Sequence, residues 1–133
     1  MDTFGQKGFL DEFRWENRIL LVFSKDTLNS DYKEQLKSHY SEADEYLERD
    51  LRVFIISEES IFDESLEKIE STALKLRNQF SVQEDDFTVI LIGKDGGEKL
   101  RSSKPIRNEK LFSTIDAMPM RRSEMIREKK DNP

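Results

Sequence analysis

Three short apolar runs alternate with longer stretches in which apolar side chains recur every three or four positions. The runs cover residues 19–24, 51–57 and 87–92, and each is rich in Ile, Leu, Val or Phe. Runs this short and this apolar predict strands that are buried on both faces of a sheet. A fourth strand is expected over residues 99–102, because the Asp-Gly-Gly sequence at 95–97 is typical of a hairpin turn.

The stretch after the first run predicts one amphipathic helix. Its apolar residues recur at steps of three and four, so they share one face. They are Tyr32, Leu36, Tyr40, Ala43 and Leu47. Asn29 or Ser30 is expected to cap this helix. A helix of this length between two buried strands indicates a parallel βαβ unit with a right-handed crossover.

The later stretches predict further helices. One is expected to start at the capping residue Asp63 and to bury every third or fourth residue. Its apolar residues are Leu66, Ile69, Ala73, Leu76 and Phe80. Asn108 is expected to cap another helix. Pro119 is expected in the first turn of a last helix that runs to Glu128, since proline does not fit a helix interior.

The resulting order of elements, βαβαββα, predicts an α/β protein with a thioredoxin-like core. Its mixed four-stranded sheet has the order 2-1-3-4, with helices on both faces. The chain of 133 residues fits a single domain over residues 9–128, with a flexible lead-in at 1–8 and a frayed tail at 129–133. Four apolar residues at the start are expected to pack on the sheet. They are Phe9, Leu10, Phe13 and Trp15.

The turn after the first strand lies where ligands bind in open α/β sheets, at the carboxyl ends of the strands. Its polar residues are Ser24, Lys25, Asp26, Thr27, Asn29 and Ser30. Thioredoxin chemistry needs a thiolate at this place, and the chain has no cysteine. It also has Asp85-Asp86 where thioredoxins have a cis-proline. Thiol–disulfide exchange is therefore excluded, while the helix N-terminus remains a candidate anion site. Self-capping by Asn29 or Ser30 is the alternative.

Charge is distributed unevenly along the chain, which has a net charge of −6. Residues 1–92 contain 21 acidic and 11 basic side chains, whereas residues 93–133 contain 7 and 11. The acidic part disfavours nucleic-acid binding. The basic part is either a patch for a partner or a solvated helical face. The absence of a long apolar run and of a signal-peptide pattern predicts a soluble chain with no membrane span.

The sequence MPMRRSEM is the first candidate for a partner-binding surface, because methionine suits adaptable contacts and arginine suits carboxylates and phosphates. The candidate residues are Arg101, Met118, Met120, Arg121, Arg122 and Met125. In the alternative, the methionines pack on the sheet and the arginines bond acids such as Asp116 and Glu124. Exposed edges of the second or fourth strand are a second candidate.

No catalytic group, metal site or cofactor is predicted. His39 is the only histidine, and neither of the acidic pairs at 58–59 and 85–86 has the spacing of a metal-binding loop. The leading hypothesis is therefore a non-catalytic module that binds a protein or an anionic ligand. The alternatives are a thiol-independent enzyme that acts on a small anionic substrate at residues 24–30, or a mainly structural domain.

Four segments also carry a family resemblance. They are FRWENRILLVFS at 13–24, ERDLRVFII at 48–56, FTVILIGKDGGEKLRS at 87–102 and LFSTIDAMPMRRSEM at 111–125. Through them the chain resembles an uncharacterised family of small bacterial proteins, which also occurs as repeated domains of animal coiled-coil-domain-containing matrix and sushi-repeat-containing proteins. The resemblance implies a thioredoxin-like fold and no known activity. Because many relatives are exported, it also raises a periplasmic or extracellular location as an expectation.

Overall fold

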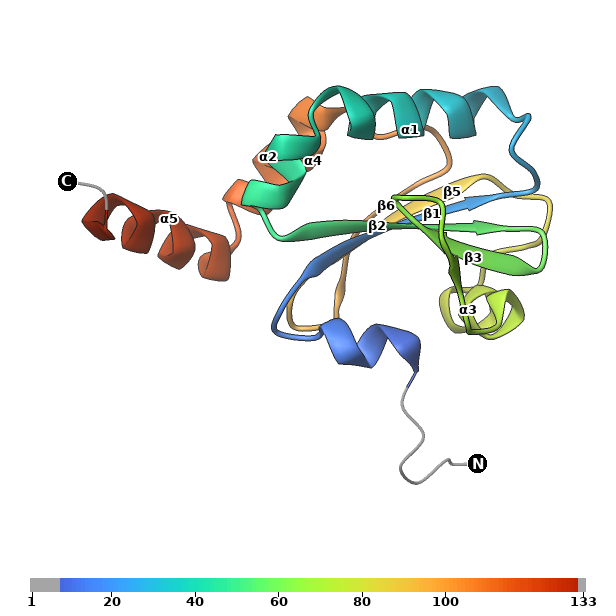
Figure 1. The fold of residues 1–133 in the computed structure, drawn as a ribbon, viewed down its shortest axis with the longest axis horizontal. Helices are drawn as coiled ribbons and strands as arrows, with labels where there is room; N and C mark the ends of the chain where they lie inside the picture. The colour runs from blue at the N-terminus through green and yellow to red at the C-terminus, as the bar shows by residue number, and fades with distance from the viewer. Residues whose placement is uncertain (1–7, 132–133) are drawn as a thin grey trace.

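A six-stranded mixed sheet forms the centre of the protein (Figure 1). The structure is a computed structural model and describes residues 8–131. The predicted lead-in therefore falls almost wholly outside the described residues, as do the last two residues of the predicted tail. The strand order is β4-β3-β2-β1-β5-β6.

Three of these strands are the ones that the apolar runs predict, and a fourth is the strand expected after the hairpin turn. Strand β1 (Arg18–Ser24) pairs in parallel with β2 (Leu51–Ser57) and antiparallel with β5 (Thr88–Ile92). Strand β6 (Glu98–Ser102) then pairs antiparallel with β5, across the predicted hairpin turn. The hairpin turn predicted from Asp-Gly-Gly is confirmed. Gly96 has a φ of 86° in it, which residues with a side chain rarely adopt. The expected order 2-1-3-4 is confirmed as the order β2-β1-β5-β6.

The helix predicted to start at Asp63 is wrong over its first half, which forms two extra strands. Strand β3 (Ser60–Asp63) pairs with β2, and β4 (Lys68–Ile69) pairs with β3. The Asp63 carboxylate accepts hydrogen bonds from the amides of Ser65 and Glu67, so it closes a turn and caps no helix. Helix α3 (Ala73–Phe80) begins ten residues later, capped by Thr72. Because β3 covers β2, the edge predicted at the second strand does not exist.

Helices cover both faces of the sheet, as expected. One face packs against α1 (Ser30–Ser41), α2 (Ala43–Glu48) and α4 (Asn108–Asp116). The other face packs against α3 and the short 3-10 helix η1 (Phe9–Phe13). The last helix, α5 (Pro119–Asp131), starts at the predicted proline and extends away from the sheet (Figure 1).

The single apolar stripe predicted for the first helix is wrong from Tyr40 onward. The helix breaks at Glu42, where φ is −136° and ψ is 40°, and resumes as α2. Tyr40 lies before the break but off the buried face of α1, and is 50 % exposed. After the break α2 buries Tyr46 and leaves Leu47 70 % exposed. Asn29 does cap α1, but Arg107 occupies the capping position of α4 in place of Asn108.

The aromatic cluster at the start of the chain is only partly as predicted. Phe9, Leu10 and Phe13 pack against the sheet. Trp15, expected in the core, is 59 % exposed and has a φ of 72°. Its amide donates a hydrogen bond to the carbonyl of Lys94 at 2.6 Å, which holds the turn against the β5–β6 loop and leaves the indole outside.

Gln35 is a buried polar residue that fixes the loop before α4. Its side-chain amide donates to the carbonyl of Ile106 at 3.1 Å and accepts from the amide of Ile106 at 2.7 Å. We expect Gln35→Leu to lower the free energy of unfolding by about 2–4 kcal/mol, since both backbone groups lose their partner in the interior. Urea denaturation measures this loss, with the exposed Gln79→Leu on α3 as the matched control. A loss below about 1 kcal/mol would contradict this role.

Candidate functional site

The turn at residues 24–30 is built from local hydrogen bonds. Ser24 donates through its hydroxyl to the carbonyl of Asp26, and the Asp26 carboxylate accepts from the amide of Leu28. Asn29 accepts from the amides of Asp31 and Tyr32, which are the groups that an anion would contact at this helix N-terminus. The helix is therefore capped by its own side chain. An anion site at this turn stays a prediction.

The same turn lies close to the loop before β5. The Lys25 ammonium is 3.9 Å from the carboxylate of Asp85, in an ion pair that is exposed to solvent. These two loops correspond to those that carry the cysteine pair and the cis-proline of thioredoxins. Here they are neighbours, and neither loop contains a cysteine or a proline.

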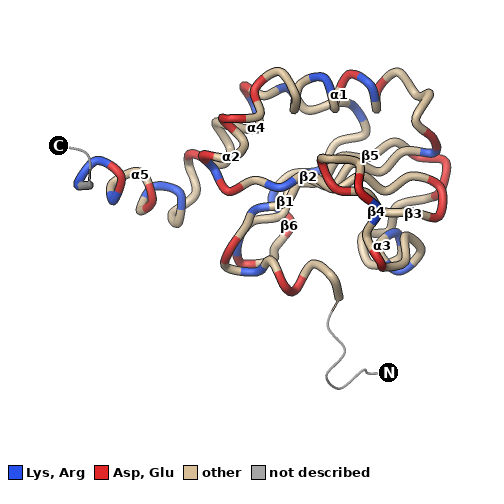
Figure 2. The backbone as a smooth tube through the Cα atoms, viewed as in Figure 1, with Lys and Arg blue, Asp and Glu red and all other residues tan. Residues whose placement is uncertain are grey.

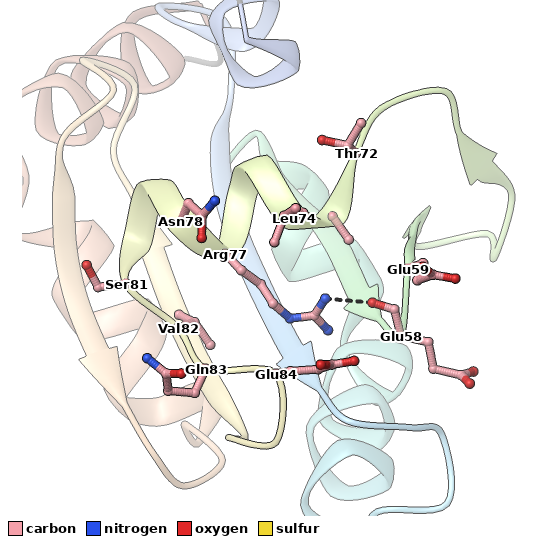
Figure 3. A pocket seen from close by; sticks show the side chains of 11 residues that line it. Glu58, Glu59, Thr72, Leu74, Arg77, Asn78, Ser81, Val82, Gln83 and Glu84 are labelled. Atoms are coloured by element: carbon pink, nitrogen blue, oxygen red, sulfur yellow. Dashed lines mark hydrogen bonds between the residues drawn. The ribbon is translucent and has the colours of Figure 1, made fainter.

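A pocket of about 700 Å³ opens beside this region, next to α3. It lies between the turn that joins β2 to β3 and the loop that follows α3 (Figure 3). The residues that line it include the charged Glu58, Glu59, Arg77 and Glu84 and the apolar Leu74 and Val82. Strand β2 ends here and β5 begins here. The pocket therefore lies at the carboxyl ends of the parallel strands, where ligands bind in open α/β folds.

Arg77 is the distinctive residue of this pocket. Its side chain is 7 % exposed and points from α3 toward the Glu58 turn (Figure 3). Atom Nη1 donates to the carbonyl of Glu58 at 2.6 Å. Atoms Nε and Nη2 are buried and have no hydrogen-bond partner among residues 8–131. A buried donor without a partner destabilises a fold by about 1–3 kcal/mol, and by more when it is charged.

Three glutamates give the pocket an acidic rim. Glu58, Glu59 and Glu84 line it and are exposed. Within the described part of the chain, none of them forms an ion pair with Arg77. The pocket thus combines a buried cation with acidic groups in contact with water.

The structure divides the partner-binding residues predicted from MPMRRSEM. Arg121 is 1 % exposed, so its guanidinium is not available to a partner. Met118 packs against the core, and Met125 is partly buried, whereas Met120 and Arg122 are exposed. Arg101 is also exposed, but it bonds Glu98 and the carbonyl of Phe80 at the end of α3, on the other face of the sheet from α4. The six residues therefore do not form one patch.

Arg121 pairs with Asp116 and Glu124, as the alternative interpretation of this segment expected, and it belongs to a larger charged cluster that the sequence did not predict. Four cations with little exposure meet five acids near the N-terminal ends of β1 and β2, where both charge signs gather (Figure 2). The cations are Arg18, Arg49, Lys94 and Arg121, and the acids are Glu45, Glu48, Asp50, Asp116 and Glu124. We call these nine residues the ion cluster. Each of the four segments that carry the family resemblance contributes to it.

Glu124 and Asp116 are the acids that join the cluster together. Glu124 accepts from Arg18 and from Lys94, at 2.7 Å in the latter case. Asp116 accepts from both Arg49 and Arg121. Burial raises the pKa of each carboxyl, but these hydrogen bonds outweigh it, so both pKa values are lowered. The cluster thereby ties α4 and α5 to the ends of β1 and β2.

His39 lies inside the protein, against the ring of Tyr46. Burial lowers its pKa, and the nearby Glu64 opposes this effect. Within residues 8–131, no group of three or more histidine and acidic side chains is arranged to hold a metal ion. In the same residues, no helix is both long enough and apolar enough to cross a membrane.

The strand order and the helices on both faces define a thioredoxin-like protein that lacks cysteine. The chain belongs to the family described as a domain of unknown function (DUF4174), whose model matches residues 9–124. It is similar to coiled-coil domain-containing protein 80 of Danio rerio, with 26 % identity over 136 residues. That match covers 90 % of this chain but only 16 % of the fish protein.

Among solved structures, the fold is similar to reduced 2-Cys peroxiredoxin of Plasmodium vivax. The TM-score is 0.63 at 11 % identity, over 86 % of this chain and 84 % of that one. Identity this low supports the fold alone. Since this chain has no cysteine, it has no thiol redox chemistry.

We expect Arg121→Met to lower the free energy of unfolding by about 1–3 kcal/mol, because Glu48 loses its charged hydrogen-bond partner and Asp116 keeps only Arg49. Urea denaturation of wild type and variant measures the loss. The neighbouring Arg122→Met is the matched control, and its exposed side chain should change stability by less than about 0.5 kcal/mol. Equal losses in the two variants would show that the ion cluster does not stabilise the fold.

Glu124 also predicts a dependence of stability on pH. Its pKa is lower in the folded protein than the ordinary 4.5, so its contribution is complete above that value and is lost as pH falls below it. We expect Glu124→Gln to be less stable at pH 7 and to lose less stability than wild type between about pH 5 and pH 3. Thermal unfolding across this range measures both effects, with the exposed Glu34→Gln as control. Parallel pH profiles for Glu124→Gln and wild type would refute the prediction.

Proposed function

We propose that the protein is a non-catalytic binding module whose ligand occupies the pocket beside α3. One observation carries the proposal: the guanidinium of Arg77 is buried in that pocket with two of its three nitrogen atoms unpaired. In this chain the other buried arginines at the ion cluster have acidic partners. A buried cation that lacks such a partner indicates a group kept for binding at the expense of stability.

The alternative, a thiol-independent enzyme at residues 24–30, has less support. Ser24 and Asn29 are engaged in the turn itself, and Asn29 shields the helix N-terminus from an anion. Catalysis would need a nucleophile next to a base within a concave site. The geometry of this turn does not supply that arrangement.

A partner surface on α5 remains a further proposal, restricted to the exposed Met120 and Arg122 and the partly buried Met125. Methionine and arginine suit adaptable protein contacts. The hollow beside this helix is lined largely by the ion cluster, whose groups already have partners. The pocket at Arg77 is therefore the better-supported site. Export from the cell, which the family resemblance suggests, also stays a prediction.

We expect a library of small fragments of mixed charge to give binders that perturb the amide resonances of residues 58–59, 72–78 and 82–84. Two-dimensional ¹⁵N–¹H NMR of the full chain measures this directly. Asn78→Trp should abolish the binding, because residue 78 lines the pocket and the indole would fill it. Gln79→Trp is the matched control on the neighbouring exposed position, which does not line this pocket. Binders that perturb other surfaces only would refute the proposed function.

A further inference from the structure

We propose that the pocket beside α3 recognises a ligand with a carboxylate and a cationic group, and that the carboxylate binds the Nε–Nη2 edge of Arg77. This inference rests on the proposed function and adds the chemical class of the ligand.

The first argument is the geometry of the free edge. Nε and Nη2 form one side of the guanidinium, and their two N–H groups match the two oxygens of a carboxylate. Three other arginines of this chain use the same edge for a carboxylate: Arg49 with Asp116, Arg52 with Glu64 and Arg101 with Glu98. Their nitrogen–oxygen distances are 2.8–3.1 Å. In Arg77 both atoms of this edge are unpaired and have almost no exposed surface, so a carboxylate reaches them when the side chains that cover them move aside.

The second argument is that Arg77 is held in position. Its Nη1 atom donates to the carbonyl of Glu58, which fixes the plane of the guanidinium. Glu58 itself has a φ of 53°, so the turn presents this carbonyl from a conformation that residues with side chains rarely adopt. A donor pair that the fold holds in place binds an anion more tightly than a mobile surface arginine does, because less side-chain entropy is lost on binding.

The third argument is the charge of the rim. Glu58, Glu59 and Glu84 line the pocket and are exposed. They repel a ligand that carries only negative charge and attract a cationic group. A buried arginine beneath an acidic rim therefore matches a zwitterion. The pocket volume of about 700 Å³ accommodates an amino acid or the end of a peptide.

The test is an NMR titration of the full chain with four probes at one pH and low salt. The probes are 6-aminohexanoate, which has both charges, glutarate, 1,5-diaminopentane and inorganic phosphate. We expect 6-aminohexanoate to perturb the amides of residues 72–78 and 82–84 saturably, and the other three to bind more weakly. An equal or higher affinity for the diamine, for glutarate or for phosphate would overturn the inference.

Two substitutions test the role of the arginine edge. Arg77→Lys keeps the charge but removes the paired donors, so it should weaken 6-aminohexanoate binding about tenfold or more. Arg77→Met should abolish the binding. The control Arg122→Lys, on an exposed arginine of α5, should leave the affinity unchanged. Wild-type affinity in Arg77→Lys would overturn the inference.

The same titration distinguishes two kinds of zwitterionic ligand, which are small molecules and the carboxyl-terminal ends of peptides. The peptide Gly-Gly-Lys with a free carboxyl terminus should bind, and its carboxyl-amidated form should not. Tighter binding of the peptide than of 6-aminohexanoate assigns the site to peptide ends, and weaker binding assigns it to small zwitterions. If neutral fragments occupy the pocket while all carboxylate probes fail, this inference falls and the proposed function stands. If nothing occupies the pocket, both fall.

Discussion

The ion cluster is the interaction on which the arrangement of the C-terminal half depends. Helix α5 carries charged residues along its length and extends from the body (Figure 2). It has little apolar surface to bury, so Glu124 and Arg121 attach it by charge. Arg18 and Arg121 are almost fully buried, which is unfavourable unless each charge has partners with good geometry. The cluster gives both charges carboxylate partners, although the Nε atom of Arg18 is buried without a partner in the described structure. It joins segments as far apart as residues 18 and 124.

Arg77, at the other end of β2, lacks the carboxylate partners that the arginines of the ion cluster have. It is also buried, but its only hydrogen bond reaches a backbone carbonyl, and two of its donors are unpaired in the described structure. Proteins keep such groups mainly where binding or catalysis requires them. This contrast separates the charges that stabilise the fold from the charge that we assign to binding. Paired charges hold the fold together at one end of the sheet, and an unpaired charge lines a pocket at the other.

The sequence predicts those features that depend on neighbouring residues. The buried strands, the cap at Asn29, the glycine turn and the position of Pro119 follow from local chemistry, and so does the absence of thiol chemistry. The β3–β4 hairpin could not be predicted in this way, because residues 60–69 have a helical spacing that pairing with β2 overrides. The local pairs of the ion cluster, such as Arg121 with Asp116, were within reach of the sequence. The pairs that join the helices to the strands were not, since those partners are 30 to 106 residues apart.

Arg77 did leave a signal in the sequence. Ala73, Leu76 and Phe80 define the buried face of α3, and residue 77 falls on that face at the i+4 position from Ala73. An arginine at a core position of an amphipathic helix indicates either an internal ion pair or a binding group. Only the structure distinguishes these cases. The free energy of unfolding of Arg77→Met, measured by urea denaturation without ligand, tests that distinction most directly. The account predicts a value equal to or above that of wild type, and a loss of more than about 2 kcal/mol would contradict it.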